Sequence, residues 1–210
     1  MTQSLMTSGL GELAITRVPY SAKETLQAFD QADLLALDHL HTEGVLTPSS
    51  RVLVVNENFG AITCAVTKAL AEVGGVSPTL WSDSHIAQLG LQFNAQANDL
   101  PMANFVQAQD TPEGPFDLAI LRLPKSHALL RDQVRRMLPQ LAPSALVIMP
   151  VMVKHLDSAV YQLLESLLGK ITTSLARKKA RLIFASGSEN SQGHGPSPEQ
   201  VVWDLPTLGL

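Results

Sequence analysis

The densest group of potentially functional side chains in this sequence is basic and lies near its C-terminal end. It consists of Arg177, Lys178, Lys179 and Arg181. Basic side chains that contact RNA phosphates supply affinity without reading the bases. Charges on an exposed edge strand also prevent pairing with other strands, so a purely structural interpretation stays open. If this segment is a strand, alternation places Lys179 and Arg181 on one face and Lys178 on the other.

A second set of basic residues surrounds the end of a predicted strand near residue 123. Lys125 directly follows that strand, where it could meet a phosphate or complement nearby carboxylates. Arg131 and Arg135 are four residues apart on the next predicted helix and share a face, and Arg136 is adjacent. Arginines in this arrangement are more typical of a solvated helix face than of an RNA contact.

Other kinds of catalytic chemistry have little support in the sequence. The six histidines include no pair at the helical i, i+4 spacing of a zinc-binding motif, so no metal centre is expected. Cys64 is the single cysteine, which excludes a disulfide framework, and we expect it to be a small core residue. No Gly-x-Ser-x-Gly motif occurs, so a serine hydrolase is unsupported.

Composition bounds the class of protein further. Of the 210 residues 45% are hydrophobic and only 16% charged, which suits a substantial core and argues against disorder throughout. The net charge of −4 excludes a globally basic nucleic-acid binder but is compatible with a local basic patch. Aromatic residues, at 5%, are few for a protein that stacks single-stranded bases. Residues 1–13 lack a signal-peptide pattern, and the longest near-apolar run, 145–153, is too short to span a membrane; we expect a cytoplasmic protein.

Hydrophobic periodicity predicts strands that alternate with helices along most of the chain. The predicted strands are 51–55, 79–81, 104–107, 117–123 and 145–153, and the helices are 60–73, 84–97, 126–141 and 155–168. This alternation is typical of a parallel sheet with helices on both faces. Residues 1–20 carry no clear pattern, whereas Ser21 and Glu24 have the spacing of a capping box and predict a helix ending before Gly44. Strands at 178–185 and 200–205, with a Gly-, Ser- and Pro-rich loop between them, predict an antiparallel pair.

The loop after the first parallel strand is the usual place for a nucleotide-type ligand in such a sheet. Here it reads Asn56-Glu57-Asn58-Phe59-Gly60, and only its last residue is glycine. Four side chains therefore enter the space that a cofactor would fill, and no G-x-G-x-x-G or phosphate-binding loop occurs in the sequence. The two asparagines are typical of turns, because Asn tolerates left-handed backbone and forms local hydrogen bonds.

Three stretches of the sequence resemble the N-terminal domains of ribosomal RNA guanine-N2 methyltransferases, with the large-subunit enzymes as the nearest type. They are residues 52–61 (VLVVNENFGA), residues 123–130 (LPKSHALL) and residues 176–182 (ARKKARL). The resemblance runs from about Ser21 to Leu205. It implies an α/β, Rossmann-like methyltransferase fold with a mostly parallel twisted sheet, helices on both faces and a C-terminal antiparallel hairpin.

The resemblance also implies that this chain is the degenerate first domain of a two-domain enzyme. In that family the first domain helps to bind and position RNA, and a second domain holds S-adenosylmethionine and an Asn-Pro-Pro-Phe/Tyr catalytic motif. The sequence ends at Leu210, before any such second domain. An active domain has an acidic residue and three glycines along the first strand and its loop. The matching residues here are Val54, Asn56, Asn58 and Gly60.

Two further positions bear on catalysis through the same resemblance. Leu123-Pro124-Lys125 stands where an active domain has Asn-Pro-Pro, so the amide that would hold the amine being methylated is missing. Asp83 matches the acidic residue that would bind the ribose of the cofactor. An acidic residue there also suits a helix N-terminus on electrostatic grounds.

We therefore interpret the sequence as one domain, with an N-terminal extension containing one helix (1–45) and a degenerate methyltransferase-like part (46–210). It is expected to bind and position ribosomal RNA through the C-terminal basic cluster, with Lys125 as a further candidate, for a catalytic domain in the same parent protein. No cofactor, metal or membrane partner is expected for this chain. Two alternatives stay open: a methyltransferase active by itself through Asp83 and a rebuilt loop, or a structural domain that only packs on a catalytic partner.

Overall fold

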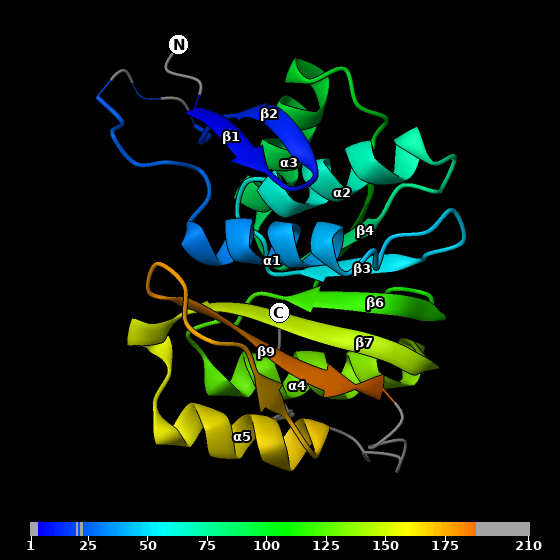
Figure 1. Cartoon of the computed structure of the whole chain (residues 1–210), viewed down its shortest axis with the longest axis vertical. Coiled ribbons are helices and arrows are strands. Elements are labelled where there is room, and N and C mark those ends of the chain that lie inside the picture. Colours follow the sequence, from blue (N-terminus) through cyan, green and yellow to red (C-terminus); the bar gives the residue numbers. More distant parts are fainter. Residues whose placement is uncertain (1–3, 20, 22, 188–210) are drawn as a thin grey trace, which may run out of the picture.

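The computed structural model describes residues 4–19, 21 and 23–187, which form a seven-stranded sheet flanked by helices and a separate two-stranded hairpin (Figure 1). The strands are β1 (Ser4–Ser8), β2 (Gly11–Ile15), β3 (Val52–Val55), β4 (Thr79–Ser82), β5 (Asn104–Gln107), β6 (Phe116–Leu121), β7 (Leu141–Met152), β8 (Thr172–Thr173) and β9 (Ala180–Ser186). The helices are α1 (Gln31–Thr42), α2 (Ala61–Glu72), α3 (His85–Ala97), α4 (His127–Met137) and α5 (Ser158–Leu168), with short 3-10 turns at Leu138–Gln140 and Val153–His155.

The strand order in the large sheet is β5-β4-β3-β6-β7-β9-β8. The first five strands of this order are mutually parallel, while β9 runs antiparallel to both β7 and β8. Because each parallel pair needs a crossover, strands and helices alternate through most of the parallel part, although no helix lies between β5 and β6. The carboxyl ends of β3, β6 and β7 consequently meet at one edge of the sheet, where we look for a candidate site.

The sheet separates two hydrophobic clusters. Val52 and Val54 of β3 belong to the cluster beneath α1, α2 and α3, whereas Leu53 and Val55 belong to the cluster beneath α4 and α5. All four β3 residues are buried, as expected for a parallel strand covered on both faces. Figure 1 shows α1 to α3 and the β1–β2 hairpin on one side of the sheet and α4 and α5 on the other. The α/β fold class predicted from the sequence is confirmed.

The first thirty residues differ from the prediction. Residues 4–15 form the β1–β2 hairpin, whose buried Met6, Leu13 and Ile15 join the core. The predicted helix start at Ser21 is wrong, because Ser21 and Glu24 form a turn through a backbone hydrogen bond of 3.1 Å. The helix begins nine residues later, where the Asp30 carboxylate caps α1 and Asp33 completes the capping box. The boundary drawn at residue 45 stays a prediction.

The end of the chain differs in its strand bounds. Lys178 and Lys179 lie in a turn, and β9 begins at Ala180, so the predicted alternation of these lysines along a strand is wrong. The antiparallel partners of β9 are β7 and β8, and the predicted strand at 200–205 lies outside the described residues. Among the helices that the structure describes, none is long and apolar enough to cross a membrane.

Candidate nucleic-acid interface

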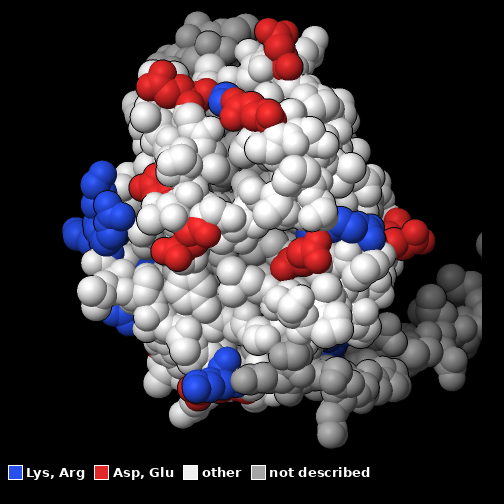
Figure 2. All heavy atoms as spheres, turned by 45° about the vertical axis from the view of Figure 1, so that its right-hand side comes forward, with Lys and Arg blue, Asp and Glu red and all other residues white. Residues whose placement is uncertain are grey.

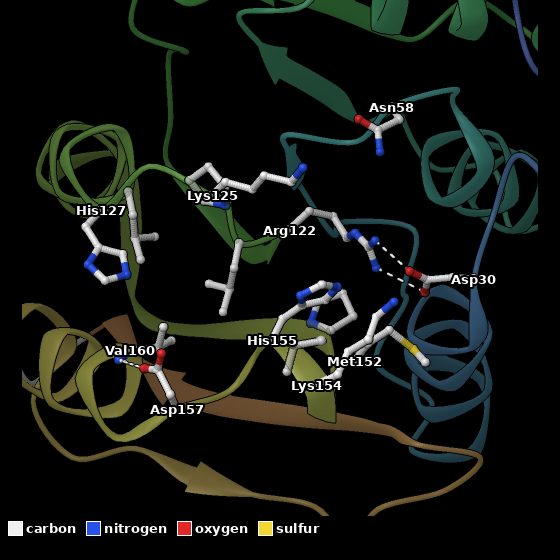
Figure 3. A pocket seen from close by; sticks show the side chains of 15 residues that line it. Asp30, Asn58, Arg122, Lys125, His127, Met152, Lys154, His155, Asp157 and Val160 are labelled. Atoms are coloured by element: carbon white, nitrogen blue, oxygen red, sulfur yellow. Dashed lines mark hydrogen bonds and ion pairs between the residues drawn. The ribbon is translucent and has the colours of Figure 1, made fainter.

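A cleft of about 550 Å³ opens at the carboxyl ends of β6 and β7 (Figure 3). Its polar walls are formed by Asp30, Asn58, Arg122, Lys125, His127, Lys154, His155 and Asp157. Its apolar lining comes from Leu123, Pro124, Leu130, Pro150, Val151, Met152 and Val160. The first group comes from loops that follow strands and from helix starts, and the second from the strand ends and from α4 and α5. The cleft is of the size and mixed lining that small-ligand sites have.

Arg122 anchors one wall of this cleft to α1. Its guanidinium donates to both oxygens of Asp30, at 2.9 and 3.2 Å, and lies 2.8 Å from Asp33. Bidentate arginine–carboxylate pairs are strong and directional. Because Asp30 and Asp33 also cap α1, the ion cluster fixes the start of that helix against the end of β6. Arg122 was not among the residues predicted from the sequence, since its partners lie about ninety residues earlier.

The ion cluster shifts the pKa values of all three groups. Burial raises the pKa of the Asp33 carboxyl to about 6, against the opposing attraction of Arg122. For Asp30, burial acts in the same direction, but the hydrogen bonds and charge of Arg122 outweigh it and hold its pKa below the ordinary value. Burial would lower the pKa of Arg122, yet Asp33 and Asp30 together raise it. Arg122 is therefore the group that keeps two acidic residues charged here.

The loop after β3 is stabilised by its own side chains. Asn56 adopts a left-handed conformation with φ of 60°, as expected for turn chemistry, and its amide pairs with Gln133 of α4, whose Nε2 donates at 2.7 Å. Glu57 is 5% exposed, and its carboxylate accepts from the backbone amides of Ile62 and Thr63 at the start of α2. Burial raises the pKa of Glu57 to about 7, although the hydrogen bonds from Thr63 oppose the shift.

The same loop packs on α3 at the level of the backbone. A Cβ atom placed on Gly60, whose φ is 84°, would lie 2.8 Å from Cα of Leu91. A Cβ atom on Gly90 would lie 2.8 Å from Cα of Phe59. Buried Asn94 adds hydrogen bonds from its Nδ2 to the carbonyl oxygens of Phe59, at 2.7 Å, and Thr16, at 2.9 Å. Loop, helix and the end of the N-terminal hairpin therefore form one closely packed unit.

We expect Gly90→Ala to lower the free energy of unfolding by about 2 kcal/mol, as overpacking does in tight cores. Helix propensity alone predicts the opposite, a gain of about 1 kcal/mol for Ala over Gly inside α3. Unfolding in urea measures the sign of the change in stability and so distinguishes overpacking from helix propensity. Gln92→Ala, at an exposed position of the same helix, is the matched control and should change stability by less than about 0.5 kcal/mol. A Gly90→Ala variant as stable as the wild type would show that α3 does not touch the loop so closely.

Three residues of the predicted basic cluster, Arg177, Lys178 and Lys179, lie at the tip of the hairpin that leads into β9. Arg177 and Ala180 exchange two backbone hydrogen bonds, of 2.9 and 2.8 Å, around Lys178 and Lys179. Both lysines have positive φ, 48° and 64°, which defines a type I′ turn. The side chains of all three basic residues are exposed. Val153 donates to the carbonyl of Lys179 at 2.9 Å, so the tip lies at the same sheet edge as the cleft.

The other predicted basic residues lie elsewhere. Arg181 is half-buried, with its Nη1 3.5 Å from the Tyr161 hydroxyl of α5, so it is directed away from the turn. Arg136 stacks 5.0 Å from the Trp81 ring and donates to the carbonyls of Ala108 and Asp110, both at 2.6 Å. That arginine thus holds α4 to the loop after β5 rather than facing solvent. Lys125 lies on the rim of the cleft.

Cys64 is buried in the core beneath α2, as expected. Within the described residues, no three His, Cys, Asp or Glu side chains lie together in a way that could hold a metal ion. Figure 2 shows a face of the molecule on which acidic and basic side chains are scattered among uncharged ones. The candidate interface is thus local, made of the hairpin tip and the cleft.

Comparison with known proteins identifies the family of this chain. The family described as the RLMG N-terminal domain matches residues 3–189, most of the sequence. The chain belongs to this family. Its relatives include proteins named ribosomal RNA large subunit methyltransferase G from Ectopseudomonas mendocina, 39% identical over 98% of this chain, and from Stutzerimonas stutzeri, 42% identical over 94%. The chain spans about half the length of these relatives, 54% and 52% respectively.

Solved structures of methyltransferases share the fold of this chain. The Thermus thermophilus 16S rRNA N2 G1207 methyltransferase RsmC, in complex with AdoMet and guanosine, superimposes with a TM-score of 0.67 over 88% of this chain and 50% of that one. A putative SAM-dependent methyltransferase from Streptococcus mutans gives 0.61 over 89% of this chain and 56% of that one. Identities of 21% and 15% establish the shared fold alone. The predicted resemblance to ribosomal RNA methyltransferases and the Rossmann-like fold are confirmed.

The loop after β3 does not fit S-adenosylmethionine. Its backbone packs on α3 so closely that a Cβ atom on Gly60 or Gly90 would lie 2.8 Å from the other segment, and the Glu57 carboxylate accepts from the amide groups at the start of α2. Asp83 is exposed and borders a hollow of about 180 Å³ that shares no lining residue with the cleft. The residues that would hold the two ends of such a cofactor therefore do not face one common space.

Proposed function

We propose that this chain is the RNA-positioning domain of a ribosomal RNA guanine-N2 methyltransferase and transfers no methyl group itself. A catalytic domain in the same parent protein would carry the cofactor and the reaction. Family membership, the half-length match to the relatives and the closed loop after β3 support this division of labour. Holding the RNA beside a catalytic domain accelerates the reaction by making the encounter effectively unimolecular. A bacterial protein that acts on ribosomal RNA would do so in the cytoplasm.

The single observation that carries the proposal is the composition of the hairpin turn. A type I′ turn requires positive φ at both central residues and therefore strongly favours Asn-Gly. Lys178 and Lys179 occupy those positions, at a conformational cost of about 1 kcal/mol or more per residue. Two exposed cations at a tip where folding prefers uncharged residues are more easily explained by phosphate contact than by stability.

We expect the Lys178→Asn, Lys179→Gly double variant to be more stable than the wild type by about 1 kcal/mol and to bind RNA more weakly. The binding measurement is a titration with a fragment of large-subunit ribosomal RNA at several salt concentrations. Loss of two phosphate contacts should reduce the salt slope by about 1.5. Because stability and affinity change in opposite directions, weaker binding could not result from unfolding.

Lys170→Gln is the matched control, since Lys170 is an exposed lysine after the end of α5, at the opposite edge of the sheet. It should leave affinity and slope unchanged. If the wild type does not bind at low salt, the domain is a packing scaffold for its catalytic partner. If it binds S-adenosylmethionine in a direct titration and methylates RNA alone, it is an enzyme in its own right.

A further inference from the structure

The cleft at the ends of β6 and β7 contains two lysines that have no ion-pair partner among the described residues. Lys125 follows β6 and Lys154 follows β7, and neither ammonium group has an ion pair or hydrogen bond with another described residue. Of the two carboxylates on the cleft wall, Asp30 binds Arg122, whereas Asp157 caps α5 by accepting from the amide of Val160 at 2.9 Å and keeps its negative charge. The basic side chains on the cleft wall, Arg122, Lys125 and Lys154, therefore outnumber its two carboxylates.

The arrangement of these groups matches a nucleotide better than a bare anion. Figure 3 shows Lys125, Lys154 and His155 reaching into the space between the ends of β6 and β7. Beneath them lies the apolar lining defined above, including Val151 and Val160. Ammonium groups suit a phosphate, and an exposed imidazole beside an apolar wall suits the face of a base, because histidine is among the side chains on which unpaired bases stack.

We propose that this cleft binds a single unpaired nucleotide, with its phosphate between Lys125 and Lys154 and its base against His155 and the apolar lining. The inference rests on the proposed function, since it takes the nucleotide to be part of the RNA that the hairpin tip holds. A cleft of about 550 Å³ accommodates one nucleotide and excludes a duplex, so it selects RNA with an unstacked residue. The tip supplies affinity for any RNA backbone, and the cleft supplies a preference for a looped or bulged one.

The mononucleotide arm of the test uses GMP, UMP, guanosine and inorganic phosphate, titrated into the 210-residue chain while its amide NMR signals are followed. GMP and UMP should shift signals around residues 123–127 and 153–157. Guanosine and phosphate should each bind more weakly than GMP. The Lys125→Gln, Lys154→Gln variant should lose at least about tenfold in GMP affinity, whereas arginine at both positions should retain it. Unshifted cleft signals in the wild type would overturn the proposal.

The RNA arm compares one hairpin RNA that carries a single bulged nucleotide with the same hairpin fully paired. The wild type should prefer the bulged RNA, and the Lys125→Gln, Lys154→Gln variant should bind both equally. The tip variant for this arm is Lys178→Gln, Lys179→Gln, which should weaken the binding of both RNAs and keep the preference. Both lysines of the cleft are exposed, so thermal unfolding of the cleft variant should match that of the wild type.

The two arms separate this inference from the proposed function. One outcome is that GMP binds and that RNA binding depends on Lys178 and Lys179 but shows no preference for the bulge. The cleft would then bind a free nucleotide, and its proposed role in RNA binding would be overturned. RNA binding with no GMP binding would overturn the cleft and leave the positioning function standing. Absence of all RNA binding would refute the proposed function, while the GMP titration would still decide whether the cleft binds nucleotides.

Discussion

Replacing Arg122 by Met is expected to lower the free energy of unfolding by about 4 kcal/mol at neutral pH, because it leaves two acidic groups without their counter-charge. Arg122 binds Asp30 through Nη1 and Nη2 and Asp33 through Nη1, and Asp33 is buried. Met preserves much of the side-chain volume, so packing contributes little to the loss. Chemical denaturation at pH 7.5 measures the effect.

The control for this prediction removes the Asp33 carboxylate, which has no counter-charge once Arg122 is replaced. Asp33→Asn in the Arg122→Met background should recover part of the lost stability, since a neutral amide does not need the guanidinium. The loss in Arg122→Met should also shrink toward pH 5, where Asp33, whose pKa is about 6 even beside Arg122, becomes protonated. A loss below about 1 kcal/mol at pH 7.5 would mean that solvent screens the cluster as it does a surface ion pair.

The parallel core of this fold could be predicted from local sequence patterns. β3 reads as four consecutive apolar residues, and the structure buries all of them. The start of α1 could not be predicted in the same way. Ser21 with Glu24 and Asp30 with Asp33 both have capping-box spacing, and only packing of α1 on β7 and β9 decides between them. Such a contact joins residues more than a hundred positions apart.

The residues of the candidate site could be predicted where a charged side chain directly follows a buried strand. Lys125 was found because it follows a buried strand, and the same signal at the end of β7 would have indicated Lys154 and His155. The turn at Lys178 and Lys179 was not predictable, because its residue types contradict the preference of a type I′ turn. Departures of this kind, in which local preference and structure disagree, are where functional residues are expected.

The closed loop after β3 should give the protein a measurable pH dependence through Glu57. Its pKa is raised from 4.5 to about 7, so between these values the folded chain holds a proton that the unfolded chain has lost. The contribution of Glu57 to stability is therefore full below pH 4.5 and is lost as the pH rises through 7. The size of the loss is on the order of 3 kcal/mol, at about 1.4 kcal/mol per unit of pKa.

Glu57→Gln removes this titration, although its amide nitrogen cannot replace the carboxylate oxygen that accepts from Thr63. Whatever the difference in stability between variant and wild type at pH 5, it should change in favour of the variant as the pH rises to 8, because only the wild type loses the contribution of Glu57. Asp33, with a pKa raised to about 6, and Asp30, with a lowered one, titrate in both proteins, and the charge of Asp33 is itself one of the causes that raise the pKa of Glu57. Parallel curves across this range would show that Glu57 is ionised in the folded chain at pH 5, so that its burial is offset by the hydrogen bonds from Ile62 and Thr63 or by water in the loop after β3. A loop open to water would in turn reopen the question of a cofactor beside Gly60, so this measurement tests the structural basis for a non-catalytic domain.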